Sequence, residues 1–179
     1  MLTDDLDVKI AGDKPSEDVR RNKNKPVQNS SVSSEQIKGA KAVGKKVAES
    51  FIADAETEVS EEFRDYDMIL QRRLLLSFTA TAGFEKYISD DTLVGVAQKS
   101  FLETLNKHSS ELYKTSSDTG AFSFYYLAFR RGSEVDRRIG QTFAMLCSHD
   151  GDPIFQELGE ALYCWFLSVV RKAITEHLR

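Results

Sequence analysis

The sequence predicts an all-α fold, a single compact bundle of five to six helices preceded by a disordered arm. After Ser34, apolar residues recur at intervals of three and four over most of the chain, which is the spacing of one helix face. The 179 residues include only three prolines and ten glycines, fewer than a turn-rich β fold would use. This length suits one domain with a sizeable core.

Residues 1–33 form the predicted disordered arm, and residues 34–179 the predicted helical domain. Large apolar residues are scarce in the arm and no period runs through it, and such a segment cannot bury enough apolar surface to become ordered. Its six acidic residues lie between Asp4 and Asp18, and four of its six basic residues follow them, so a basic half that docks on an acidic partner is the alternative to a solvated arm. The chain start also lacks the basic segment and apolar run of a signal peptide.

The first helical segment begins after the arm, with Ser34 as the expected N-cap. The sequence leaves open whether residues 34–88 form one bent helix or two. A single rod would bend near Thr57, whereas a second helix would be capped by Ser60. The small and apolar residues of the first helix face are Ile37, Ala40, Gly44, Val47, Phe51 and Ala55.

Three further helices are expected between residues 90 and 149. Asp90 or Asp91 opens the first, which runs to about Lys114. Residues 121–129 are rich in aromatics and suit a strand, but no second strand candidate exists to satisfy the backbone groups of a lone one. We therefore predict a helix there, capped by Asp118. The next helix has the form of a capping box, made by Ser133 and Asp136.

The last helix is expected to start at Asp152, with Pro153 in the first turn where its missing amide costs nothing. From Ala161 to Val170 the segment is apolar on almost every side, so we predict that this helix lies at the centre of the bundle. Cys164, between two aromatic residues, is predicted to be a small buried group.

Composition and motifs exclude several classes of function. A net charge of −4 disfavours nucleic-acid binding, which usually requires a basic domain. The most apolar run is far shorter than the roughly twenty residues of a membrane span. Two cysteines are too few for a disulfide framework, so the cytosol is the simplest location. The sequence contains no nucleophile elbow, phosphate loop or dinucleotide-binding pattern.

The stretch from Met145 to Phe166 holds the weak candidates for a metal site: Cys147, His149, Asp150 and Asp152. A zinc site needs about four ligands at paired spacings, and on a helix residues 147 and 149 would point away from each other. A turn explains these residues more fully, because Gly151 suits a left-handed backbone after a helix and Asp152 with Pro153 opens the next. We therefore predict a turn, with no metal and no cofactor.

Two further candidate ligand sites remain. Four arginines flank an expected helix start, whose free amides suit a small anion or an acidic partner: Arg130, Arg131, Arg137 and Arg138. Ion-paired surface residues are the alternative. Tyr125, Tyr126 and Trp165 can line an apolar pocket between helices, with core packing as the alternative.

The functional hypothesis is a non-catalytic cytosolic helical module that binds another protein, or a second copy of itself, without nucleic acid or membrane. The first alternative is a ligand-binding regulatory bundle that combines the aromatic pocket with the arginine site. An enzyme of an all-α class is the third.

Overall fold

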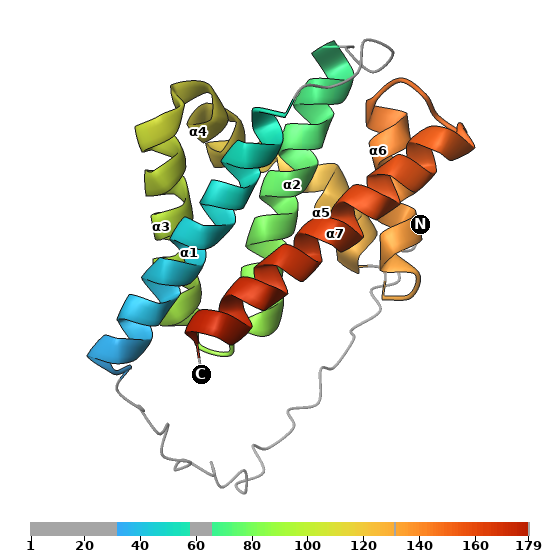
Figure 1. Ribbon diagram of the computed structural model, residues 1–179. Coiled ribbons are helices and arrows are strands. Elements are labelled where there is room, and N and C mark those ends of the chain that lie inside the picture. The colour runs from blue at the N-terminus through green and yellow to red at the C-terminus, as the bar shows by residue number, and fades with distance from the viewer. Residues whose placement is uncertain (1–31, 58–65, 131, 179) are drawn as a thin grey trace, which may run out of the picture. The chain divides into compact units, whose positions relative to one another are not determined.

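The computed structural model describes residues 32–57, 66–130 and 132–178. This part of the chain contains seven α-helices and one short 3-10 helix, η2, and no strand (Figure 1). The all-α class is confirmed, with one helix more than the largest number expected. The elements are α1 Ser34–Ala55, α2 Tyr66–Tyr87, α3 Asp91–His108, α4 Ser110–Ser117, η2 Thr119–Phe122, α5 Ser123–Arg130, α6 Val135–Leu146 and α7 Pro153–His177.

Some predictions fall outside the described residues, namely the conformation of residues 1–31, the cap at Ser60 and any role of Arg131. The open question about residues 34–88 has an answer, because α1 and α2 are separate helices. Among the described helices, none has a stretch long and apolar enough to traverse a bilayer.

The extra helix arises at Ser109, where the single helix expected after Asp90 divides into α3 and α4. Ser109 has an extended backbone (φ −154°, ψ 117°), which stops α3. Its hydroxyl then accepts a hydrogen bond from the Leu112 amide and caps α4. One serine therefore ends one helix and starts the next, as expected of a residue that favours caps over helix interiors.

Helix starts follow local capping chemistry, with two corrections. The N-cap of α1 is Ser33 rather than Ser34, and Ser33 forms a reciprocal capping box with Gln36. The predicted box of Ser133 and Asp136 is wrong. Helix α6 begins after Glu134, which has a left-handed backbone (φ 50°) and no side-chain cap bond, so the chain enters α6 one residue later than the box requires.

The aromatic segment is helical, as predicted. Asp118 accepts a hydrogen bond from the Ala121 amide, which starts η2, and η2 leads directly into α5. The stretch after Leu146 forms the predicted turn. Gly151 has a φ of 79°, and the Asp152 carboxylate accepts from the Ile154 amide at 2.8 Å to cap α7.

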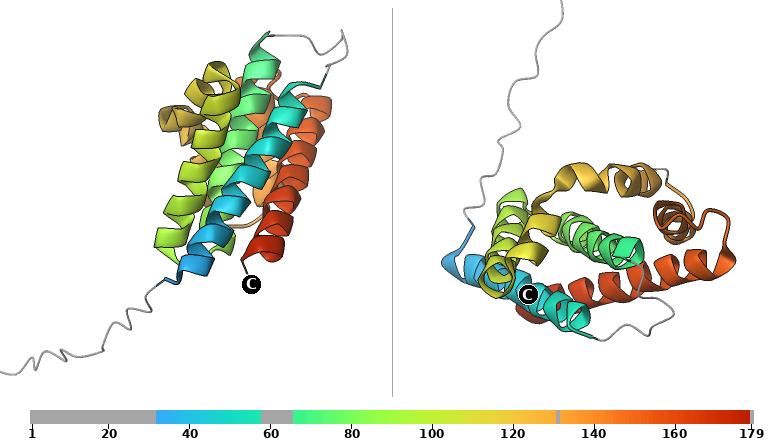
Figure 2. Two further views of the ribbon diagram at one scale, coloured as in Figure 1. Left: turned by 60° about the vertical axis from the view of Figure 1, so that its left-hand side comes forward. Right: turned by 90° about the horizontal axis from the view of Figure 1, so that it is seen from above.

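The centre of the bundle is α2, not α7, which corrects the sequence prediction. Figure 2, seen from above, shows α2 enclosed by the other helices, and every side chain from Leu74 to Ala80 is buried. By contrast, α7 exposes Ala161, Cys164 and Trp165. The predicted burial of Cys164 is therefore also wrong, because α7 covers the core with one face only.

The buried hydroxyl groups of α2 all have hydrogen-bond partners. A helix that is not uniformly apolar can therefore occupy the centre of the bundle at little cost in free energy. The Ser77 and Ser116 hydroxyls lie 2.7 Å apart and join α2 to α4. The Thr79 hydroxyl donates to the Leu75 carbonyl one turn earlier. At the edge of the core, the Arg72 guanidinium donates twice to the Asp54 carboxylate and ties α2 to α1.

Candidate functional site

A groove lies between α5 and α6, with a volume of about 380 Å³. Spacings of three and four positions place one stripe of each helix in its wall. Asp150, in the turn after α6, also lines the groove. The lining residues from the two helices are Phe124, Leu127 and Ala128 of α5 and Arg138, Gln141, Thr142 and Met145 of α6.

The wall of this groove exposes large apolar side chains. Phe124, Leu127 and Met145 are 53%, 58% and 42% exposed. Among the described residues, five large hydrophobic side chains are exposed in this way, and three of the five line the groove. Single exposed apolar residues are ordinary on protein surfaces, whereas a contiguous group marks a candidate interaction site.

The opposite faces of α5 and α6 hold the groove in place. Tyr125 of α5, and Ile139 and Phe143 of α6, are buried in the core. With eight residues, α5 is too short to be stable on its own, so its packing must maintain it. The groove is therefore set on a scaffold of buried residues rather than on a loop.

Phe78 of α2 anchors α5 through several ring contacts. The Phe78 ring stacks on Tyr125, with centroids 5.5 Å apart, and meets Tyr126 edge-on at 5.1 Å. Phe122 and Phe129 approach the same ring edge-on at 6.2 and 6.0 Å. Offset and edge-on pairs are the favoured aromatic geometries, so this cluster positions the whole of α5.

Opposite charges lie toward the two ends of the groove. Arg138 is in the first turn of α6, and Asp150 follows its last turn. Helix α6 has 12 residues and is therefore about 18 Å long. The groove thus carries a cation toward one end, an anion at the other and apolar side chains between.

The predicted arginine site is not assembled in the described part of the chain. Arg130 lies over the Tyr126 ring at 5.8 Å, and Arg137 pairs with Glu134 at 3.6 Å. Arg138 lines the groove. These three side chains have separate surroundings, and the ion-paired surface that the sequence offered as the alternative describes Arg137.

The three aromatic residues of the predicted pocket are also apart. Tyr125 is fully buried and Tyr126 half-buried, both against Phe78. Trp165 is 43% exposed on α7, and its ring contacts that of Phe166 at 5.4 Å. The groove is lined by none of the three, although it lies on the same helix as the two tyrosines.

The weak metal candidates have individual structural roles. Cys147 is buried, at 1% exposure. The His149 ring stacks on Phe155 with centroids 3.7 Å apart. Asp152 caps α7, while Asp150 lines the groove. Among the described residues, no group of three or more His, Cys, Asp or Glu side chains is placed to hold a metal ion.

Cys164, the other cysteine, is exposed. Loss of water around the thiol, together with the nearby Asp136 and Glu160 carboxylates, raises the pKa of this cysteine. A raised pKa lowers the thiolate fraction at neutral pH, and the thiolate is the nucleophilic form. The surroundings of Cys164 therefore do not activate it.

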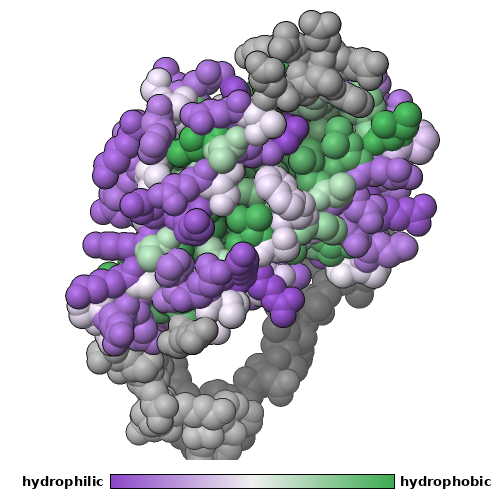
Figure 3. Space-filling view, in the orientation of Figure 1, coloured by the Kyte–Doolittle hydropathy of each residue, from purple (hydrophilic) through white to green (hydrophobic). Residues whose placement is uncertain are grey.

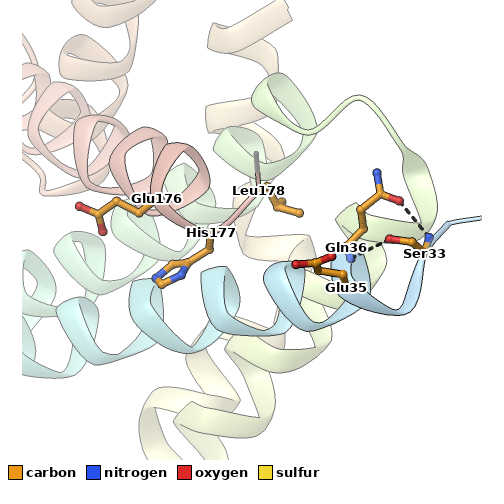
Figure 4. A pocket seen from close by; sticks show the side chains of 6 residues that line it. All are labelled: Ser33, Glu35, Gln36, Glu176, His177 and Leu178. Atoms are coloured by element: carbon orange, nitrogen blue, oxygen red, sulfur yellow. Dashed lines mark hydrogen bonds between the residues drawn. The ribbon is translucent and has the colours of Figure 1, made fainter.

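A second hollow, of about 500 Å³, lies where the start of α1 meets the end of α7 (Figure 4). Ser33 and Gln36 use their polar groups in the capping box. Figure 4 shows Glu35 and Glu176 on either side of His177, with the Glu176 carboxylate pointing away. Because these side chains do not converge, this hollow is a weaker candidate than the groove.

The hydropathy of the surface differs between regions. On the face drawn in Figure 3, hydrophilic side chains predominate over α1, and apolar side chains gather toward the N-terminal half of α7. Ile154 and Trp165 are the exposed large hydrophobic residues of α7, at 64% and 43%. They lie more than two helical turns apart in the sequence, and neither lines the groove.

We expect replacement of Tyr125 with phenylalanine to leave stability unchanged or to raise it by about 1 kcal/mol, because a buried polar group without a partner costs free energy. The Tyr125 hydroxyl is buried and has no hydrogen-bond partner in the described structure. The measurement is urea unfolding at pH 7. A large loss of stability would contradict this account of the hydroxyl.

The same variant should respond less to alkaline pH. Burial, with a smaller effect of Cys147, raises the pKa of Tyr125, and burial raises the pKa of Tyr163 to about 12. The folded state therefore favours the neutral phenols. The stability that Tyr125 and Tyr163 contribute is fully present below pH 10, and it is lost as the pH rises toward the pKa values of these residues in the folded state. Urea unfolding between pH 8 and 11 measures this loss, and a flat profile in the wild type would contradict it.

Comparison of the chain with protein-family models, curated proteins and solved structures gives no match.

The exposed residues of the groove were the part of the site that sequence reasoning missed. Phe124 and Leu127 lie in the aromatic segment 121–129, for which the sequence predicts a helix but no exposed face, and Met145 has no predicted role. Helical spacing put Leu127 beside other apolar positions, and no pattern in the sequence separates a covered leucine from an uncovered one. Their exposure depends on which helices pack against α5 and α6.

Proposed function

We propose that this protein is a non-catalytic helical module that binds another protein through the groove between α5 and α6. The observation that supports the proposal is the grouping of Phe124, Leu127 and Met145, all about half exposed, along one groove. Burial of such side chains stabilises a complex by roughly 25 cal/mol per Å² of apolar area before the costs of association. We also propose a cytosolic location, supported by the two unpaired cysteines.

The anatomy of the groove supports protein binding. Protein interfaces combine an apolar centre with a polar rim, and the groove has apolar side chains between Arg138 and Asp150. Rim charges chiefly set orientation and the rate of association. The ring contacts between Phe78 and α5 hold α5 in place in the unbound chain, which supports a surface that needs little rearrangement to bind.

Replacement of Leu127 with glutamine is expected to weaken partner binding about tenfold. The change removes apolar contact area and places an amide in the interface, at a cost of about 1–2 kcal/mol. Glutamine is a good helix former, so the fold should be retained. Quantitative capture of binding partners from the native host, using the full chain as bait, measures the effect.

The matched control is Ile154→Gln. Ile154 is 64% exposed and Leu127 58%, so the two changes remove similar exposed apolar surface, but Ile154 lies outside the groove. Both variants should melt within a few degrees of the wild type, since surface substitutions change stability by about 0.5 kcal/mol or less. Equal capture by the wild type and Leu127→Gln would refute the proposed function.

A further inference from the structure

We infer that the groove binds a second copy of this chain, in a twofold-symmetric dimer in which Arg138 of each copy faces Asp150 of the other. This inference rests on the proposed function, because it names the partner of the same surface. It follows from two properties of the groove, the order of its charges and its pairing of a ridge with a hollow.

The order of charges is self-complementary. One α6 helix presents Arg138 in its first turn and Asp150 just beyond its last turn. Two such helices placed antiparallel bring each cation to the other copy's anion, and twofold symmetry makes the contact twice. A parallel arrangement would instead bring like charges together, so the charges select the antiparallel one.

The shape is also suited to a twofold contact. Phe124 and Leu127 of α5 are large and about half exposed, while the smaller Ala128 and Thr142 line the groove beside them, so the large side chains should stand above the small ones. In an isologous contact the ridge of each copy faces the hollow of the other. Between the two charged ends, apolar side chains therefore meet apolar side chains.

The whole chain has a net charge of −4, which opposes the association of two copies. The charged residues that line the groove are one cation, Arg138, and one anion, Asp150, so their charges balance at this surface. The apolar patch consists of three half-exposed side chains, which is less than a permanent interface presents. We therefore expect a reversible dimer with a dissociation constant in the micromolar range.

A charge-swap experiment tests the arrangement. Arg138→Glu leaves two acidic groups in each copy's groove, and Asp150→Lys leaves two basic groups. Each variant alone should dimerise at least about tenfold more weakly than the wild type, because both cross-copy contacts become repulsive. An equimolar mixture of the two should form a dimer again, since both contacts of the mixed dimer then join opposite charges.

Sedimentation velocity over a concentration series, with the full chain, gives the dissociation constants. Native mass spectrometry identifies the mixed dimer, because the two variants differ in mass. The matched control is Lys99→Glu on α3, an exposed lysine outside the groove whose replacement changes the net charge as Arg138→Glu does. Lys99→Glu should dimerise as the wild type does. Recovery on mixing also shows that both variants are folded.

The inference is overturned if the wild type stays monomeric up to about a millimolar, or if mixing the two variants does not restore the dimer. These failures are distinguishable from failure of the proposed function. If the chain is monomeric but Leu127→Gln still loses a host protein that Ile154→Gln retains, the groove binds a different partner. If Leu127→Gln changes neither dimerisation nor capture, both proposals are wrong.

Discussion

Replacing Gly44 with valine is expected to cost the bundle about 3 kcal/mol of stability, the upper end of the usual range for overpacking. At Gly44, α1 lies directly against the backbone of α3. A β-carbon there would overlap the Ala97 carbonyl oxygen and lie 2.9 Å from the Phe101 amide nitrogen. Because both are backbone atoms, α3 cannot give way without shifting as a whole, and overpacking of this kind is destabilising.

Urea unfolding followed by circular dichroism measures the effect, and α3 offers a control. No atom lies within 4 Å of a β-carbon built at Gly95, which is an exposed interior position of that helix. Gly95→Ala should therefore raise stability by about 0.5–1 kcal/mol, the ordinary gain from removing glycine from a helix. A Gly44→Val protein as stable as the wild type would show that α1 and α3 do not meet at this glycine.

Truncation of Phe78 to alanine is expected to cost about 3–5 kcal/mol, the range found for large aromatic residues in cores. Phe78 is fully buried, and its ring contacts four aromatic rings of η2 and α5. Its loss removes these contacts and leaves a cavity at the base of α5. Since α5 has only eight residues, this helix should lose more protection than any other.

The control for this prediction is Phe124→Ala, the same chemical change on α5 itself. Phe124 is 53% exposed, so its truncation should cost less than about 1 kcal/mol. Urea unfolding gives the stabilities, and amide hydrogen exchange reports the opening of each helix. Equal losses for the two variants, or unchanged exchange in α5 of Phe78→Ala, would contradict the anchoring role of Phe78.

Local patterns predicted the helices well, because helix formation and capping depend on residues close together in the sequence. Asp152 followed by Pro153 marked the start of α7, and Asp90 caps α3 as expected. The errors concern alternatives of similar local quality. Ser33 and Ser34 are the same residue type and are equally suitable as N-caps. Ser133 and Asp136 are the residue types of a capping box, but the backbone there does not adopt the conformation that the box requires.

The choice of central helix shows where hydrophobicity was misleading. Residues 161–170 of α7 are more uniformly apolar than α2, which contains Ser77 and Thr79. Yet α2 is the enclosed helix, because its buried hydroxyl groups bond to Ser116 and to the Leu75 carbonyl. A satisfied hydroxyl costs little in a core, and whether a partner will be present is a property of the packed helices.

The candidate site divides in the same way. The sequence pointed to arginines and aromatic residues around α5 and α6, and two of its residues, Arg138 and Asp150, line the groove. It grouped Tyr125 with Trp165, but Tyr125 is buried on α5 against Phe78, whereas Trp165 is partly exposed on α7. Side chains that are distant along the chain are brought together only by the packing of helices, and the spacing of residues in the sequence does not predict that packing.

By itself, the sequence determined the helical class and the turn between α6 and α7, since these depend on periodicity and capping over a few residues. Only the tertiary structure decided that α2 is central, that Trp165 is exposed and that Phe124, Leu127 and Met145 form one open groove. The physical reason is that periodicity defines which residues share a face of a helix, whereas exposure depends on whether another helix covers that face.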